Sequence, residues 1–216
     1  MFEWTILTVG HLSRNKFWGE DEETAYRLPL ATCILLRGEG ETIIIDPSLP
    51  AKEMAEALLN NSGLHLEDVT RVYSTHFHYD HHVDLDSFPN ARKFMPKIDV
   101  DYLKSHRDEV MGMWTMLRSE NVDVLEYAED HLVSGMSMVP MPGHTAGISA
   151  YVFDTPEGKA MATGDAVMTR EFYQHNESYF YCWNMQQAID SIHHIKGMAD
   201  LIIPGHGQPF LEKTYA

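Results

Sequence analysis

The stretch Thr75-His76-Phe77-His78-Tyr79-Asp80-His81-His82 places four histidines and one aspartate within seven positions. It directly follows the apolar-rich run 69–73, so these side chains come where a predicted strand ends. Imidazole and carboxylate groups are ligands that zinc and related divalent metals prefer in proteins. Side chains alternate along a strand, whereas the turn after it can aim closely spaced side chains at one point. The stretch therefore predicts a metal site at a strand end.

Three more predicted strands end in the same way, with a histidine or aspartate that follows a glycine. These residues are His144, Asp165 and His206. Glycine and the nearby prolines set sharp turns. In a strand-rich α/β fold, such turns bring ligands from distant sequence positions to one edge of the sheets. We therefore expect all four strand ends to contribute to one site.

The order of these motifs resembles the metallo-β-lactamase fold superfamily. The recurring elements are Asp46 after an apolar strand, the H-x-H-x-D-H block 76–81, and the Gly-His, Gly-Asp and Gly-His pairs that end at His144, Asp165 and His206. The resemblance covers essentially the whole chain. It implies an α/β fold, a four-layer αββα sandwich of two mixed β-sheets flanked by helices, as a single domain over residues 1–216.

By this resemblance the chain would bind two divalent metal ions. The implied metal ligands are His76, His78 and His144 for one ion, Asp80, His81 and His206 for the other, and Asp165 as the bridge. A ligand set without cysteine favours an open catalytic centre over a closed structural zinc site. Zinc is the expected metal, with iron or manganese as alternatives. Asp80 and Asp165 are the catalytic candidates, since they would support a metal-bridging hydroxide that attacks the substrate.

Four further residues are candidates for supporting roles near the metals. Asp46 would hold a ligand histidine through its other ring nitrogen, although an aspartate at a strand end also commonly caps a turn. His82 either faces the pocket or packs in the core. Lactonases of the superfamily carry a tyrosine three positions after the bridging aspartate, where this chain has Met168. Tyr173 or Tyr179 could supply that phenol instead.

The leading hypothesis for the reaction is hydrolysis of a small ester, lactone or thioester. The resemblance argues against a β-lactamase, because those enzymes generally lack an aspartate at the position of Asp165. Only residues 208–216 follow the last ligand in this sequence, so we do not expect the helical thioester-binding region of glyoxalase II. The aromatic stretches 17–18 and 172–183 would wall an apolar pocket or pack as core. Two alternatives stay open: an iron-dependent oxygenase like the persulfide dioxygenases, and a small phosphodiester hydrolase.

Composition restricts the partners. The 216 residues include 32 acidic and 16 basic side chains, for a net charge of −16. Such a surface repels nucleic acid and anionic membranes, so a small-molecule substrate is expected. Residues 1–10 lack the pattern of a signal peptide and are expected to form a first strand, and no apolar run approaches the roughly 18 residues of a membrane span. We therefore expect a cytoplasmic protein; a homodimer through an exposed aromatic or methionine-rich face is compatible with the sequence.

Periodicity and turn residues predict the elements between the motifs. The predicted helices are 50–61, 98–121 and 184–197, and the predicted strands are 4–9, 30–37, 42–45, 69–73, 91–95, 122–127, 136–141, 148–153, 160–163 and 201–203. The stretch 167–183 is predicted to be irregular. Cys33 and Cys182 are expected to be reduced thiols, with a disulfide between them left open.

Overall fold

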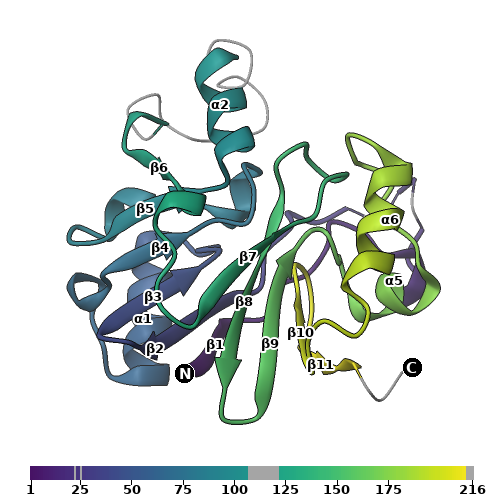
Figure 1. The fold of residues 1–216 in the computed structure, drawn as a ribbon. Coiled ribbons are helices and arrows are strands. Elements are labelled where there is room, and N and C mark those ends of the chain that lie inside the picture. The colour runs from purple at the N-terminus through teal and green to yellow at the C-terminus, as the bar shows by residue number, and fades with distance from the viewer. Residues whose placement is uncertain (22, 25, 107–121, 213–216) are drawn as a thin grey trace.

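Two mixed β-sheets form the centre of the molecule, and helices cover their outer faces (Figure 1). The computed structural model describes the chain except residues 22, 25, 107–121 and 213–216. The six strands of the first sheet lie side by side in chain order: β1 (Glu3–Thr8), β2 (Cys33–Gly38), β3 (Glu41–Ile45), β4 (Arg71–Tyr73), β5 (Arg92–Met95) and β6 (Leu125–Tyr127). The five strands of the second sheet do the same: β7 (Met136–Pro140), β8 (Ser149–Thr155), β9 (Gly158–Gly164), β10 (Leu201–Pro204) and β11 (Phe210–Leu211). The described α-helices are α1 (Ala51–Ser62), α2 (Lys97–Ser105), α5 (Arg170–His175) and α6 (Met185–Ile195).

The alternation of side chains along β3 shows how the layers arise. Ile43 and Ile45 are buried between the two sheets, together with Tyr151 and Phe153 of β8. Ile44 points the other way, into a core cluster that includes residues of α1 and α2. Because both faces of β3 are covered, residues that point to either face are apolar. Ile43–Ile45 is therefore a continuous apolar run.

The second sheet is covered in the same way on its outer face. Val152, Met161 and Ile202 pack against Ile192 and Ile195 of α6. Since two packed sheets lie between two layers of helices, the predicted four-layer αββα sandwich is confirmed.

Most predicted elements are present, with shifted ends, but three predictions need correction. The helix predicted over 98–121 is α2 up to Ser105, and its part 107–121 lies outside the described residues. The strand predicted over 122–127 is only β6. The stretch 167–183 is not wholly irregular, because it contains α5. This short helix is stabilised by burial of Phe172 and Tyr173, which is tertiary packing that local propensity does not reveal.

Parallel pairing brings the strand ends together. β3 pairs parallel with β4, and β9 pairs parallel with β10, so the carboxyl ends within each pair share an edge. Two backbone hydrogen bonds join the sheets at this edge, from Ser149 N to Thr75 O at 3.1 Å and from Thr32 N to Gly205 O at 2.7 Å. The turns after strands of both sheets therefore meet at one place.

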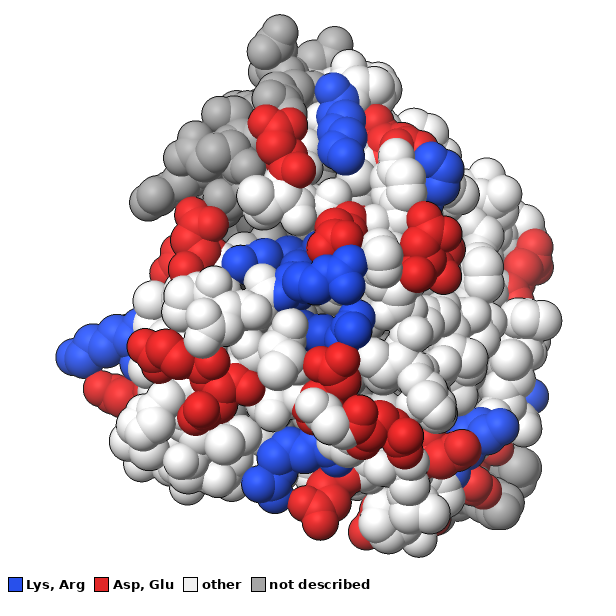
Figure 2. Space-filling view, turned by 60° about the vertical axis from the view of Figure 1, so that its left-hand side comes forward, with Lys and Arg blue, Asp and Glu red and all other residues white. Residues whose placement is uncertain are grey.

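Charged side chains are mixed on the face shown in Figure 2, where Lys and Arg lie among Asp and Glu. Arg71 pairs with Glu41 at 2.8 Å, and Arg92 pairs with Glu126 at 2.6 Å. Such pairing leaves these arginines poorly suited to phosphate binding.

Over the described part of the chain, we find no helix long and apolar enough to cross a membrane. Both cysteines are free thiols.

Candidate metal centre

Seven histidine and aspartate side chains meet at the shared strand edge, as the sequence predicts. They form a first group, His76, His78, His144 and Asp165, and a second group, Asp80, His81 and His206. Within each group the potential ligand atoms all lie within 4.8 Å of one another. All seven are buried except His78, which is half-buried. The structure thus brings together every residue that the sequence analysis names as a metal ligand.

The turn after β4 contributes to both groups because its backbone changes conformation. His76 and His78 are two positions apart, and His78 has an extended backbone, so both rings reach the first group. A 3₁₀ turn then covers Tyr79–His81 and carries Asp80 and His81 to the second group. The H-x-H-x-D-H spacing therefore encodes an extended segment followed by a tight turn.

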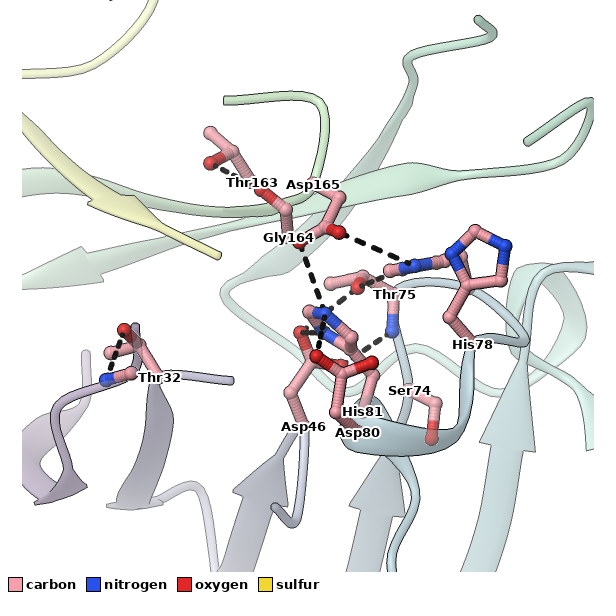
Figure 3. A network of polar contacts seen from close by, with 12 residues as sticks. Thr32, Asp46, Ser74, Thr75, His78, Asp80, His81, Thr163, Gly164 and Asp165 are labelled. Atoms are coloured by element: carbon pink, nitrogen blue, oxygen red, sulfur yellow. Dashed lines mark hydrogen bonds and ion pairs between the residues drawn. The ribbon is translucent and has the colours of Figure 1, made fainter. Parts of the chain in front are cut away.

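Asp165 belongs to the first group and also contacts the second; Figure 3 shows its side chain above Asp80 and His81. Its Oδ2 is 3.2 Å from Nε2 of His144, in the first group. Its Oδ1 is 3.0 Å from Nε2 of His81 and 3.1 Å from Nε2 of His206, in the second group. One carboxylate therefore presents a different oxygen to each group.

The electrostatics of the site are set by burial and by close charges. Burial opposes ionisation of Asp165, but His206, His81 and His144 outweigh it and hold the pKa of Asp165 well below its usual range. Burial also opposes protonation of His81 and His206, yet the adjacent Asp165 raises the pKa of both rings. The carboxylates thus favour positive charge beside the second group, which a metal cation would supply.

The first group behaves differently because imidazoles dominate it. Burial is the main cause that lowers the pKa of His76 and His78 well below the usual histidine value, and neighbouring histidines add to it. Neutral imidazole is the form that ligates a metal. These two rings are therefore in the protonation state that metal binding requires.

Hydrogen bonds to the far side of the His81 and His206 rings fix the orientation of these two rings. Nδ1 of His81 donates to Oδ2 of Asp46 at 2.8 Å, and Asp46 also accepts from the backbone N–H of Thr75 at 2.7 Å. Nδ1 of His206 donates to the Leu30 carbonyl at 2.9 Å. With Nδ1 engaged, Nε2 of each ring is directed at the site. The geometry agrees with the role expected of Asp46, which also bonds to the Thr75 hydroxyl at 2.9 Å.

The donor set fits divalent metal ions. Among the described residues, the buried atoms that make no hydrogen bond include Nε2 of His76. They also include Nε2 of His81 and Oδ1 of Asp165, which lie 3.0 Å apart as an ion pair without forming a hydrogen bond. A buried polar atom without a partner typically costs about 1–3 kcal/mol, so such atoms converging on one point call for a ligand. Nitrogen and carboxylate donors without thiolate suit zinc, iron(II) or manganese.

A cavity of about 300 Å³ opens onto both groups. Its floor includes His78, His144, Asp80, Asp165 and His206, and its walls are Leu12, Ser13, Arg14, Tyr26, Pro29, Tyr79, Tyr179, Phe180 and Tyr181. Pockets of this kind, mostly apolar with a few convergent polar groups, are typical of small-molecule sites. The arrangement leaves one side of the metal centre accessible to a substrate.

Of the two tyrosines expected near the site, only Tyr179 lines the cavity. Its hydroxyl is 2.9 Å from the Ser13 hydroxyl and 3.2 Å from the Arg14 carbonyl. Tyr173 lies elsewhere: its ring packs in the core under α6, and its hydroxyl donates to Glu212 at 3.0 Å. Because α5 turns Tyr173 inward, it does not serve as a pocket phenol.

The structure also shows how His82 and the two aromatic stretches are packed. His82 packs rather than facing the cavity, since it is buried and its Nε2 donates to the Phe77 carbonyl at 2.7 Å. Phe17 packs edge-on against Phe172, with ring centroids 5.0 Å apart, so the stretch 17–18 is not a cavity wall. Within 172–183, only residues 179–181 line the cavity.

Sequence reasoning gave no role to Tyr79 or Asp99, and it included Tyr181 only as part of the predicted pocket wall 172–183. Tyr79 and Tyr181 line the cavity. Tyr79 stands inside the histidine motif, a signal that could have identified it, whereas the position of Tyr181 depends on loop conformation. Asp99 is fully buried beside the two turns of the first group. An acidic residue near a helix start is usually exposed, so its sequence context gave no indication of this.

Comparison with known proteins agrees with this architecture. A Bacillus N-acyl homoserine lactonase is 25% identical over 159 residues, covering 73% of this chain and 61% of the lactonase, so the chain spans about three fifths of that relative. Metallo-beta-lactamase domain-containing protein 1 of Xenopus laevis is 30% identical over 179 residues, covering 78% of this chain and 67% of that protein.

Solved structures share the fold. A Thermotoga maritima protein described as a metallo-beta-lactamase superposes with a TM-score of 0.71 at 22% identity, covering 97% of this chain and 99% of its own. AidC, a dizinc quorum-quenching lactonase, superposes with a TM-score of 0.66 at 18% identity, covering 84% of this chain and 74% of AidC. The family model of the metallo-beta-lactamase superfamily matches residues 27–206. With this match over most of its length, the chain belongs to the metallo-beta-lactamase superfamily.

Proposed function

We propose that the chain is a hydrolase that binds two divalent metal ions and cleaves an ester, lactone or thioester bond of a small molecule. The observation that carries this proposal is the position of Asp165, whose two oxygens face different groups of imidazoles. Zinc is the metal we propose, because it favours imidazole and carboxylate ligands and because one structural relative is a dizinc lactonase.

Bound metal ions would supply a hydroxide nucleophile at neutral pH and polarise the substrate oxygen. The residues of this chain provide the geometry for that chemistry. Asp165 brings negative charge between the groups, while Asp46 and the Leu30 carbonyl keep Nε2 of His81 and His206 directed inward. The cavity then admits a substrate to one side of the centre.

A lactone is the substrate bond that we favour, because several relatives are N-acyl homoserine lactonases. The apolar cavity wall, which includes Leu12, Pro29 and Phe180, suits a short hydrocarbon chain attached to the reacting group. Met168 stands where lactonases of the superfamily are expected to carry a tyrosine, but its thioether side chain has no hydroxyl group and is buried in a cluster with Phe172. We propose that a cavity phenol, Tyr79 or Tyr181, orients the substrate carbonyl instead.

The second group favours this proposal over a single-iron oxygenase. Asp80, His81 and His206 are all buried, and their ligand atoms converge as closely as those of the first group. An enzyme with one iron held by the first group would leave these costly buried groups without a role. Two occupied groups give each of the seven side chains a function.

A substrate panel on the zinc-loaded protein tests the proposal. We expect hydrolysis of at least one N-acyl homoserine lactone, simple lactone, thioester or aryl ester, with kcat/KM above about 10⁴ M⁻¹s⁻¹ for the best substrate. Asp80→Ala should lower that value by on the order of 10²-fold or more with an unchanged circular-dichroism spectrum. Asp130→Ala, which removes an exposed carboxylate, is the matched control and should retain full turnover. Hydrolysis of none of these classes, or cleavage only of a chromogenic bis-phosphodiester, would contradict the assignment.

A further inference from the structure

Asp99 holds together the two turns that carry the histidines of the first group. It lies in the first turn of α2 and has no exposed surface. We propose that Asp99 is a positioning residue that sets the metal affinity of the first group and not of the second. This inference rests on the proposed metal centre, since it concerns ligands of that centre.

Three hydrogen bonds carry the inference. Oδ2 of Asp99 accepts from the backbone N–H of Phe77 at 3.2 Å, and Phe77 lies between His76 and His78. The same oxygen accepts from the hydroxyl of Thr145 at 2.9 Å. Thr145 directly follows His144, so one buried carboxylate is bonded to both ligand-bearing turns.

The third bond anchors the turn after His144. Oδ1 of Asp99 accepts from the backbone N–H of Gly147 at 2.8 Å. The approach requires glycine, because a Cβ at position 147 would lie 2.4 Å from Oδ1 and 2.6 Å from the backbone nitrogen of Asp99. The carboxylate of Asp99 can therefore approach this turn only because position 147 has no side chain.

Burial of the Asp99 carboxylate is energetically unfavourable on its own. Burial raises the pKa of Asp99 to about 6, although its bonds to Thr145, Gly147 and Phe77 act in the opposite direction. A buried carboxylate is tolerated when its hydrogen bonds are satisfied, and here all of these donors belong to the two turns.

The second group is fixed by other residues. His81 donates to Asp46, and His206 donates to the Leu30 carbonyl. Loss of the Asp99 contacts would therefore loosen His76, His78 and His144 while leaving the rings of the second group in place. Outer partners of metal ligands commonly change metal affinity by about 10–100-fold.

Asp99→Asn is the first test variant, because asparagine keeps the size but loses an acceptor for Phe77 or Gly147. Competitive titration with a chromogenic zinc chelator resolves the two dissociation constants of each protein. We expect one constant to rise about 10–100-fold and the other to stay within about twofold of the wild-type value. Equal weakening of both sites, or two unchanged constants, would overturn the inference while leaving the proposed function intact. A wild-type protein that binds no zinc would overturn both.

A second pair of variants keeps the test decisive if Asp99→Asn does not fold. Thr145→Val removes the hydroxyl that bonds to Asp99, whereas Thr145→Ser retains it. We expect the valine variant to show the same one-site loss of zinc affinity and the serine variant to bind zinc like the wild type. Identical zinc binding by the two variants would contradict the positioning role.

Discussion

Replacing Asp165 by asparagine is expected to lower kcat/KM by on the order of 10³-fold, equivalent to about 4 kcal/mol of transition-state stabilisation. Asp165 is the residue whose oxygens face both groups, at 3.0 to 3.2 Å from His81, His206 and His144. Asparagine has nearly the same shape but has no negative charge and only one acceptor oxygen. Zinc content should fall together with turnover, and both are measured on the same preparation.

Asp154→Asn is the matched control for this loss. Asp154 is an exposed carboxylate on β8, in the same sheet, and its side chain is remote from the cavity lining. We expect this control to keep wild-type turnover and zinc content. An Asp165→Asn protein that retained more than about a tenth of wild-type kcat/KM with full zinc content would show that Asp165 does not join the two groups.

Gly205→Ala is expected to damage both the fold and the centre. A Cβ at position 205 would lie 2.2 Å from Oδ1 of Asp165 and 2.8 Å from the carbonyl carbon of Gly164. The backbone cannot move away easily, because Gly205 N donates to Gly164 O at 3.0 Å and Gly205 O accepts from Thr32 N at 2.7 Å. Overpacking of this kind costs about 2 kcal/mol, which corresponds to a fall in Tm of about 4–8 °C. Because Asp165 must shift, kcat/KM should also fall by on the order of 10²-fold.

Gly63→Ala is the control that separates the loss of stability from the loss of activity. Gly63 ends α1 with a φ of 74°, and a Cβ there would meet no atom within 4 Å. Alanine in this left-handed conformation costs about 1–2 kcal/mol, so Tm should fall measurably while kcat/KM stays unchanged. Calorimetry gives the Tm of both variants and steady-state kinetics gives their kcat/KM, so loss of stability can be distinguished from displacement of Asp165. Full activity in Gly205→Ala would mean that Asp165 tolerates displacement.

The sequence was sufficient to predict the metal-facing part of the site because its geometry is local. His76, His78, Asp80 and His81 lie in one segment, whose spacing brings the first two to one group of ligand atoms and the last two to the other. The other ligands follow glycines at strand ends, and parallel pairing of β9 with β10 places Asp165 beside His206. Short-range turn chemistry and sheet topology together explain why the seven side chains meet, whereas their assignment to two metal ions rested on the resemblance to the metallo-β-lactamase superfamily.

The walls of the cavity could not be predicted in the same way. Tyr173 and Tyr179 are only six residues apart, yet α5 buries the first while the second lines the cavity. That difference depends on how a short helix packs, which local propensity does not determine. Asp99 was missed for a related reason, because its role exists only through contacts with Phe77 and Thr145 that are distant in sequence.

Elemental metal analysis of the purified, zinc-reconstituted and desalted protein tests the central claim most directly. Two groups of ligand atoms that share Asp165 predict close to two zinc ions per chain. The same measurement on Asp165→Asn should give clearly fewer. A wild-type protein that retains no zinc, or that instead retains a single iron per chain, would contradict a binuclear metallohydrolase.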